Sequence, residues 1–134
     1  MNQKTTATIG TIVFDLDGTL VDSVPDLAGA LDTLMAEKGL DAIGTETARR
    51  LIGHGIPNLV RSALAERGVA WDEEGGKAAV QRFTEIYGAR VSQETRPYAG
   101  VVRVLKKLLA EGWRMGVCTN KRERFPRLIV EDLD

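Results

Sequence analysis

The sequence TIVFDLDGTLVDS, residues 11–23, places two acidic residues directly after a short apolar segment. The residues before them are β-branched or aromatic without a helical period, so residues 8–14 are predicted to form a parallel-sheet strand buried on both faces. Asp15 and Asp17 are two positions apart, so on a continuing strand their side chains point the same way. Carboxylates this close repel each other, and burying one without a partner is costly. The pair therefore predicts a bound ligand at the carboxyl end of this strand.

A second apolar segment, residues 113–120, also ends in small polar residues. We predict a second strand here, parallel to the first and preceded by a crossover helix over 101–111. The core face of that helix is predicted to hold Val102, Leu105, Leu108 and Leu109. A further helix is predicted over residues 123–134.

The residues between the first strand and the crossover helix are predicted to form a helical insertion. Ser23 and Asp26 have the spacing of a capping box, Thr45 is a candidate cap for a second helix, and Pro57 suits the start of a third. A fourth helix is predicted within residues 72–90. The predicted inward-facing residues are Leu27, Ala30, Leu31, Leu34, Leu59, Val60, Ala63, Leu64, Val80, Phe83, Ile86 and Tyr87.

The predicted fold class is therefore α/β, a partial doubly wound parallel sheet with an inserted helical cap. Residues 1–22 and 96–134 are predicted to form the partial core, and residues 23–95 the cap. Pro97 forces an extended residue before it, where the chain returns to the core. We expect the cap to lie over the carboxyl end of the sheet, where open α/β folds bind their ligands.

The composition narrows the classes of partner. The chain has 134 residues, of which 43% are hydrophobic and 28% charged, with 18 basic and 19 acidic side chains. The resulting net charge of −1 provides no basic field for nucleic acid or anionic lipid. A single cysteine fits a reducing compartment, and neither a signal peptide nor an apolar stretch of membrane-spanning length is evident. We expect a cytoplasmic protein with no nucleic-acid or membrane partner.

The acidic pair and the threonine after the second strand together suit phosphate chemistry. Asp15 and Asp17 provide oxygen ligands for a hard cation such as Mg²⁺, which would relieve their repulsion. One carboxylate can attack phosphorus, and a second can protonate the leaving alkoxide and later activate water. Thr119 offers a hydroxyl and nearby backbone N–H groups to phosphoryl oxygens.

These motifs resemble those of the haloacid dehalogenase-like phosphatases. The segment DLDGTLVDS is similar to their first motif, and VCTNK to their second, a strand ending in threonine or serine. Within that family, TNK, TRPYAGV and a cap that begins just after the first motif resemble bacterial phosphoglycolate phosphatases. The segment IGHGIPNLVRSAL, residues 52–64, is similar to the part of the cap that faces substrate in those enzymes. The resemblance covers essentially the whole chain.

The resemblance implies a role for each matching residue. Asp15 would be the nucleophile and a Mg²⁺ ligand, and Asp17 the acid/base and a second metal ligand through its carbonyl. Thr119 and the Asn120 backbone would bind the phosphoryl group of a small phosphorylated metabolite. In the cap, His54 and Arg61 would be candidate substrate contacts.

Two further motifs of the family are missing from this sequence. One is a lysine on a helix beyond the threonine, and the other is a Gly-Asp-x-x-x-Asp stretch that completes the metal site. Lys121 is too close to Thr119 to be that lysine, and 15 residues follow Thr119. We therefore expect a C-terminally truncated form with feeble or no activity. The alternative is an inactive remnant that acts, if at all, by binding a partner or a phosphorylated ligand.

Structural interpretations of the same residues remain open. The acidic pair could form an Asx turn with a helix cap, whereas a calcium loop would require glycine at the position of Leu20. Cys118 is predicted to be a core residue, and Thr119 could simply end the strand. His54 and Arg61 could be ordinary surface residues. The residues Asp22 and Ser23 could cap a helix or shape the site.

Overall fold

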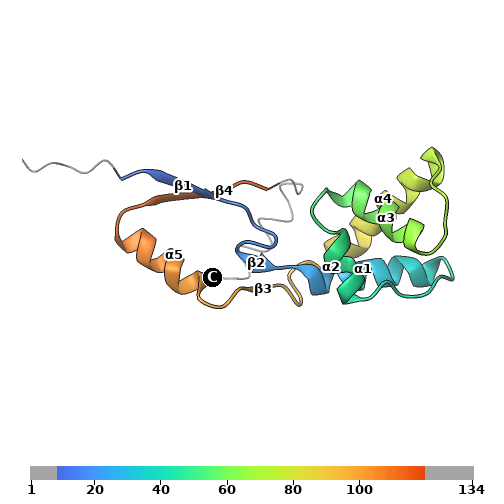
Figure 1. Cartoon of the computed structure of the whole chain (residues 1–134), viewed down its shortest axis with the longest axis horizontal. Helices are drawn as coiled ribbons and strands as arrows, with labels where there is room; N and C mark the ends of the chain where they lie inside the picture. Colours follow the sequence, from blue (N-terminus) through green and yellow to red (C-terminus); the bar gives the residue numbers. More distant parts are fainter. Residues whose placement is uncertain (1–8, 120–134) are drawn as a thin grey trace, which may run out of the picture.

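The structure is a computed structural model that describes residues 9–119. An α/β part comprises β1 (Thr11–Phe14), β4 (Arg114–Val117) and α5 (Val101–Ala110), and a helical cap comprises α1 to α4 (Figure 1). Strands β1 and β4 pair in parallel, with Thr11 opposite Arg114 and Phe14 opposite Val117. This confirms the predicted parallel pair joined through a crossover helix, although both strands are shorter than predicted.

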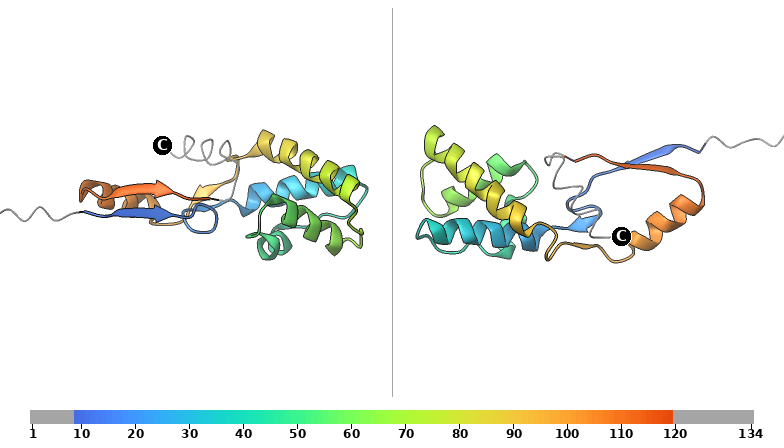
Figure 2. Two further views of the ribbon diagram at one scale, coloured as in Figure 1. Left: turned by 90° about the horizontal axis from the view of Figure 1, so that it is seen from above. Right: turned by 180° about the vertical axis from the view of Figure 1, so that it is seen from behind.

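The α/β part leaves much of its apolar surface exposed. Helix α5 lies along one face of the β1–β4 sheet in both views (Figures 1 and 2). The prediction that the first strand is buried on both faces is wrong, because Val13 is 62% exposed. The predicted core face of α5 is covered only in part: Leu105 and Leu108 are partly buried, whereas Val102 and Leu109 are exposed, Leu109 at 65%. An apolar pattern shows what a strand or helix can bury, but within residues 9–119 only α5 covers this sheet.

The cap packs around a core of its own. Its helices are α1 (Val24–Glu37), α2 (Thr45–Leu51), α3 (Ile56–Glu66) and α4 (Glu73–Arg90). The twelve inward-facing residues predicted from helical spacing are all buried or partly buried. The rings of Phe83 and Tyr87 stack with centroids 6.0 Å apart.

Two helix starts differ slightly from the predicted ones. Gly44, not Thr45, occupies the N-cap of α2, and α3 begins at Ile56, one residue before Pro57. At α4 the Asp72 carboxylate accepts a hydrogen bond from the Gly75 N–H at 2.7 Å. That cap fixes the start of a helix whose first turn contains two glycines.

The chain passes between the two parts through two short strands that lie side by side. Strands β2 (Val21–Asp22) and β3 (Arg96–Pro97) are antiparallel, with Val21 opposite Pro97. The extended conformation predicted before Pro97 is confirmed, whereas a two-residue strand such as β2 leaves no pattern to recognise. The predicted division of the chain at residues 22/23 and 95/96 remains a prediction.

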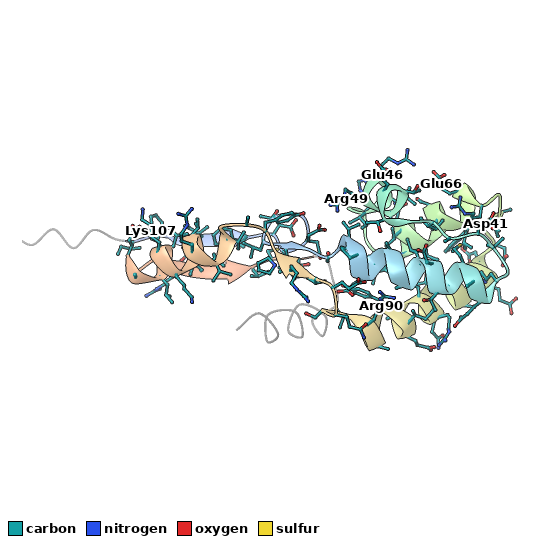
Figure 3. The ribbon with its side chains drawn as sticks, turned by 90° about the horizontal axis from the view of Figure 1, so that it is seen from below. Asp41, Glu46, Arg49, Glu66, Arg90 and Lys107 are labelled. Carbon is teal, nitrogen blue, oxygen red and sulfur yellow. The ribbon has the colours of Figure 1, made fainter. Side chains whose placement is uncertain are left out.

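A buried carboxylate, that of Asp26, binds the cap to the connection that leads into β3. The predicted capping box is wrong, because Asp26 does not return to Ser23. Asp26 is fully buried and accepts hydrogen bonds from the N–H groups of Glu94 (3.0 Å) and Thr95 (2.8 Å) and from the Thr95 hydroxyl (2.7 Å). Arg90, the last residue of α4 (Figure 3), has its Nε 3.8 Å from Asp26 Oδ1. The start of α1 is thus tied to a segment almost seventy residues later.

Ser92, in the same connection, has an unusual backbone conformation. Its φ is +72°, and it is the one non-glycine residue with positive φ within residues 9–119. Its side chain is buried, and the hydroxyl has no hydrogen-bond partner in the part of the chain that the structure describes. Strain and an unsatisfied hydroxyl therefore coincide where the chain leaves the cap.

Candidate active site

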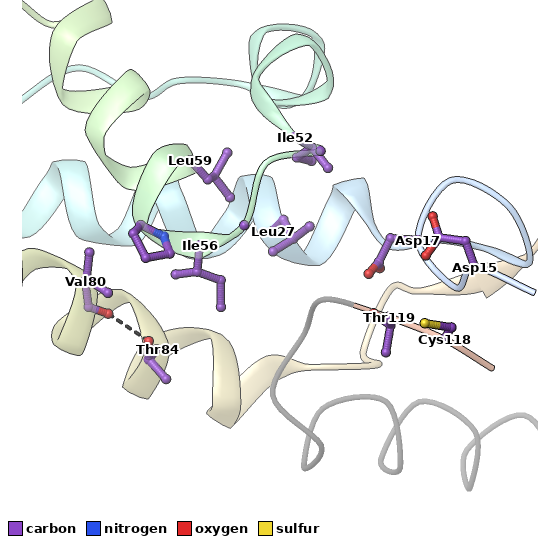
Figure 4. A pocket seen from close by; sticks show the side chains of 13 residues that line it. Asp15, Asp17, Leu27, Ile52, Ile56, Leu59, Val80, Thr84, Cys118 and Thr119 are labelled. Carbon is purple, nitrogen blue, oxygen red and sulfur yellow. Dashed lines mark hydrogen bonds between the residues drawn. The ribbon is translucent and has the colours of Figure 1, made fainter.

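A cavity of about 450 Å³ lies where the cap meets the carboxyl ends of β1 and β4. Figure 4 shows its two ends: Asp15, Asp17, Cys118 and Thr119 lie together at one, and Val80 and Thr84 at the other. The described residues that line it are Asp15, Asp17, Leu27, Ile52, Gly53, Gly55, Ile56, Pro57, Leu59, Val80, Thr84, Cys118 and Thr119. The cavity thus combines an acidic end from the sheet with an apolar wall from the cap.

The two acids are presented by the turn that follows β1. Between them Leu16 is 1% exposed and anchors the turn, so the flanking side chains point away from the interior. The Leu16 N–H donates to Asp15 Oδ1 at 2.9 Å, and the Gly18 N–H donates to the Val21 carbonyl at 2.9 Å. Gly18 has φ +75°, a conformation that glycine adopts without strain. The motif therefore folds into a tight turn that holds both acids at the cavity.

Ser23 acts at the site rather than as a helix cap. Its hydroxyl donates a short hydrogen bond to Asp17 Oδ1, and its side chain does not cap α1. Ser23 occupies the N-cap position, but it is the Asp22 side chain that bonds the start of the helix, because its Oδ1 accepts a hydrogen bond from the Val24 N–H at 3.2 Å. Asp22 also pairs with Arg49 on α2 at 3.2 Å. The open question about these two residues is thereby divided: Asp22 caps the helix, and Ser23 contacts the acidic pair.

The charge of Asp17 also acts on the cap interior. Burial raises the pKa of the Tyr87 hydroxyl, and the charges of Asp17 and then Asp26 raise it further. Tyr87 lies in the last turns of α4 and is fully buried. Asp17, which lines the cavity, therefore acts electrostatically on a buried residue of the cap.

Thr119 reaches the same edge of the sheet as the acidic pair. It follows β4 by two residues, and the parallel register sets the end of β4 beside the end of β1. The Cys118 N–H donates to the Phe14 carbonyl at 2.8 Å and extends that register. The prediction of Cys118 as a core residue is wrong, because it is exposed and lines the cavity. Asn120 and Lys121 lie outside the described residues, as does the helix predicted over 123–134.

The two cap residues predicted to contact substrate do not line the cavity. His54 is exposed, although the glycines on either side of it are cavity residues. The Arg61 guanidinium lies 4.7 Å from the centre of the Trp71 ring. The family resemblance places residues 52–64 toward substrate, and the cavity is lined by part of that segment, including Ile52 and Ile56. Val80 was missed, because it has the same helical spacing as a core residue.

Asp15 and Asp17 fit two of the ligands of a hard cation, because both line one open cavity and could supply oxygen atoms, from the carboxylate of Asp15 and the backbone carbonyl of Asp17. Within residues 9–119 no three His, Cys, Asp or Glu side chains are grouped so that they could hold a metal ion. In the same range no helix has both the length and the apolar character needed to cross a membrane.

Comparison with known proteins agrees with this geometry. Phosphoglycolate phosphatase of Caulobacter vibrioides is 44% identical over 121 residues, which cover 90% of this chain and 51% of the relative. Phosphoglycolate phosphatase 1 of Pseudomonas aeruginosa is 44% identical over 126 residues, covering 91% and 45%. The chain spans about half the length of the curated relatives it matches.

Solved structures share the fold. A predicted phosphoglycolate phosphatase from Haemophilus somnus 129pt superposes with a TM-score of 0.81 at 29% identity, covering 93% of this chain and 57% of that one. CbbY from Rhodobacter sphaeroides, solved in complex with phosphate, superposes with a TM-score of 0.73 at 20% identity, covering 93% and 57%. The family model for haloacid dehalogenase-like hydrolases matches residues 12–134. The chain belongs to the haloacid dehalogenase-like hydrolase family.

Proposed function

We propose that this chain carries the nucleophile side of a Mg²⁺-dependent phosphomonoester hydrolase. The observation that supports it is the meeting of Asp15, Asp17 and Thr119 at one cavity, from the ends of two parallel strands. The names of the curated relatives support 2-phosphoglycolate as substrate, with glycolate and phosphate as products.

The reaction has two displacements at phosphorus. In the first, an Asp15 carboxylate oxygen attacks phosphorus while the bond to the leaving oxygen breaks, which gives an aspartyl-phosphate. The Asp17 carboxyl group gives its proton to the departing alkoxide. In the second, water attacks the same phosphorus, the Asp15–phosphorus bond breaks, and Asp17 takes the proton from water. Thr119 donates its hydroxyl hydrogen to a phosphoryl oxygen during both steps.

Asp15 and Asp17 are the described residues that would hold the metal ion. When bound, Mg²⁺ supplies positive charge that relieves the repulsion between the carboxylates and the phosphoryl group. After Thr119 the sequence has no Gly-Asp-x-x-x-Asp stretch and no lysine beyond Lys121. For the 134-residue chain alone we therefore predict turnover below about 1 s⁻¹, the lower end of ordinary enzyme rates.

The test is Mg²⁺-dependent release of inorganic phosphate from 2-phosphoglycolate, measured for the purified chain and for Asp15→Asn. Release that depends on both Mg²⁺ and Asp15 is the expected result. Equal release by the two proteins would overturn the proposal. Asp41→Asn serves as a matched control, because Asp41 is an exposed carboxylate of the cap that does not line the cavity.

A second candidate function is binding without turnover. The observation that favours it is the absence of a third metal-ligating side chain beside Asp15 and Asp17 within residues 9–119. Beryllium fluoride with Mg²⁺ separates the two functions, because it mimics the aspartyl-phosphate. A ¹⁹F NMR signal from protein-bound beryllium fluoride that disappears in Asp15→Asn supports the hydrolase. The absence of a bound signal from the unsubstituted chain supports binding without turnover.

A further inference from the structure

We infer that the cap carries a second binding site, a groove on α4 that takes a small anion with a flat apolar body, such as an aromatic carboxylate. The groove lies beside the acidic cavity, and its ligand is not the substrate of the proposed reaction. The inference does not depend on the proposed function, because Trp71 and Lys77, which define the groove, take no part in it.

The groove is a hollow of about 540 Å³ between the start of α3 and one face of α4. This volume is in the range of small-molecule sites. Five of its lining residues recur along α4 at spacings of three and four, so they form one continuous stripe of the helix. The lining residues are Pro57, Trp71, Lys77, Val80, Gln81, Thr84 and Glu85.

The groove adjoins the acidic cavity at the end away from the acids. Pro57, Val80 and Thr84 line both hollows. Val80 and Thr84 lie at the opposite end of the cavity from Asp15 (Figure 4). An anion in the groove is therefore separated from the carboxylates by this part of the cap, and it contacts residues that also line the cavity.

The indole ring of Trp71 provides the flat apolar part of the groove. The ring lies against the first turns of α4, where Gly76 is buried, and a Cβ atom on Gly76 would collide with the ring. Glycine weakens a helix, so the sequence gives up helix stability at this position and makes room for the indole. Trp71 itself is only partly buried, and the part that lines the groove can pack against a flat ligand.

The charges around this ring favour an anion. The Arg61 guanidinium carbon lies 4.7 Å from the ring centre, and Lys77, the residue after Gly76, lines the groove beside the ring. Within residues 9–119 neither Arg61 nor Lys77 forms an ion pair, whereas Glu85, the one acid among the described lining residues, is paired with Arg82 at 3.0 Å. The positive charge at the Trp71 end of the groove is therefore uncompensated, and it attracts an anionic group.

Two probes of equal size test whether the groove recognises charge. 2-Naphthoate has a carboxylate and 2-naphthamide a neutral amide on the same ring system, so the ratio of their dissociation constants isolates the effect of the charge. Titration calorimetry of the 134-residue chain measures both constants. NMR locates the probes: the indole N–H signal of Trp71 should shift, whereas that of Trp113, the second tryptophan of the chain, should not.

We expect 2-naphthoate to bind about fivefold more tightly than 2-naphthamide, because its carboxylate forms a partly exposed ion pair with Lys77. Lys77→Met keeps an unbranched apolar side chain and removes the charge, so the preference should fall to about twofold or less. Lys38→Met is the matched control: Lys38 is an exposed lysine at the end of α1 that lines neither hollow, so the preference should not change. Circular dichroism verifies that both variants fold.

Three results would overturn the inference. The first is equal affinity for the two probes, or no binding of 2-naphthoate at millimolar concentration. The second is an equal loss of preference in Lys77→Met and Lys38→Met. The third is a change of more than about threefold in the affinity of Asp15→Asn for 2-naphthoate, since that would place the probe in the acidic cavity. These measurements do not involve phosphate release, so their failure leaves the proposed function untouched.

Discussion

The cap and the α/β part are built from similar sequence patterns, yet they bury very different amounts of apolar surface. Helix α5 is at least as amphipathic as α3, but α3 has four buried residues and α5 has none. The four helices of the cap pack around a common core. The described sheet has only two strands, and one helix, α5, lies against it. The difference teaches that amphipathic spacing reports only a capacity for burial.

The same comparison separates stability from chemistry. Asp15 and Thr119 belong to the thinly covered part, whereas the fully buried Phe83 and Tyr87 of the cap core do not line the cavity. We therefore expect substitutions in the two parts to change different measurements. Five substitutions test this separation, from the largest expected effect to the smallest.

Asp15→Asn should abolish chemistry and spare stability. Loss of the nucleophile is expected to lower Mg²⁺-dependent phosphate release at least about 10³-fold. Because Asp15 is exposed, the free energy of unfolding should change by less than about 1 kcal/mol. Phosphate assays and urea denaturation measure the two quantities. A large loss of stability would show that the parts are not separate.

Phe83→Ala should destabilise the cap by about 3–5 kcal/mol, because Phe83 is fully buried and stacks on Tyr87. The matched substitution in the other part, Leu109→Ala, should cost less than about 0.5 kcal/mol, because Leu109 is 65% exposed. Urea denaturation followed by circular dichroism compares them. Equal costs would contradict the contrast between the two parts.

Asp26→Asn should cost about 2–3 kcal/mol, because the amide group cannot accept every hydrogen bond that the carboxylate accepts from Glu94 and Thr95. The exposed Asp41→Asn is the control and should change stability by about 0.5 kcal/mol or less. Hydrogen exchange at the Thr95 N–H measures directly how strongly the connection before β3 is held. Unchanged protection there would show that Asp26 does not fasten it.

Tyr87→Phe should flatten the loss of stability at high pH. Burial raises the pKa of Tyr87 in the folded chain above its ordinary value of about 10. The stabilisation is therefore complete below pH about 10 and is lost above it, by about 1.4 kcal/mol per pH unit, as the unfolded chain loses the proton. Urea denaturation from pH 8 to about 11, which is about one unit above the ordinary tyrosine pKa, measures this loss of free energy of unfolding. An unchanged slope in Tyr87→Phe would contradict a Tyr87 whose pKa burial raises.

Ser92→Gly should stabilise the chain by about 1 kcal/mol. It removes the strain of φ +72° and a buried hydroxyl without a partner among the described residues, and these gains exceed the added freedom of the unfolded chain. The thermal midpoint should rise by about 4 °C. Ser92→Ala removes the hydroxyl but keeps the strain, so it should stabilise less. A lower midpoint for glycine would mean that Ser92 is not strained.

The sequence predicts those features that depend on neighbours along the chain. Residues such as Leu31 and Phe83 recur at helical spacing, so the four cap helices and their buried faces could be predicted. The turn after β1 could be predicted because Asp15, Asp17 and Gly18 occur together in one short motif. Family resemblance extended this to Thr119, about a hundred residues later.

Contacts between distant segments could not be predicted in this way. Asp26 has a good capping position near Ser23, yet its partners are Glu94 and Thr95, which no local pattern connects to it. The place of Val80 in the cavity wall was missed for a related reason, because Val80 has the same pattern whether it meets another helix or a ligand. The exposure of Leu109 depends on which other segments pack on α5, and the sequence of α5 alone does not determine this.

The side-by-side pairing of β2 and β3 has a consequence for engineering. Since Val21 lies opposite Pro97, the entry and exit points of the helical insertion are adjacent, as the two ends of a hairpin are. A tight turn could join them, and an insertion of another size could be grafted at the same pair of strands. Because Ser23 lies inside this module and its hydroxyl donates to Asp17 Oδ1, a graft would have to keep that serine to preserve the turn after β1.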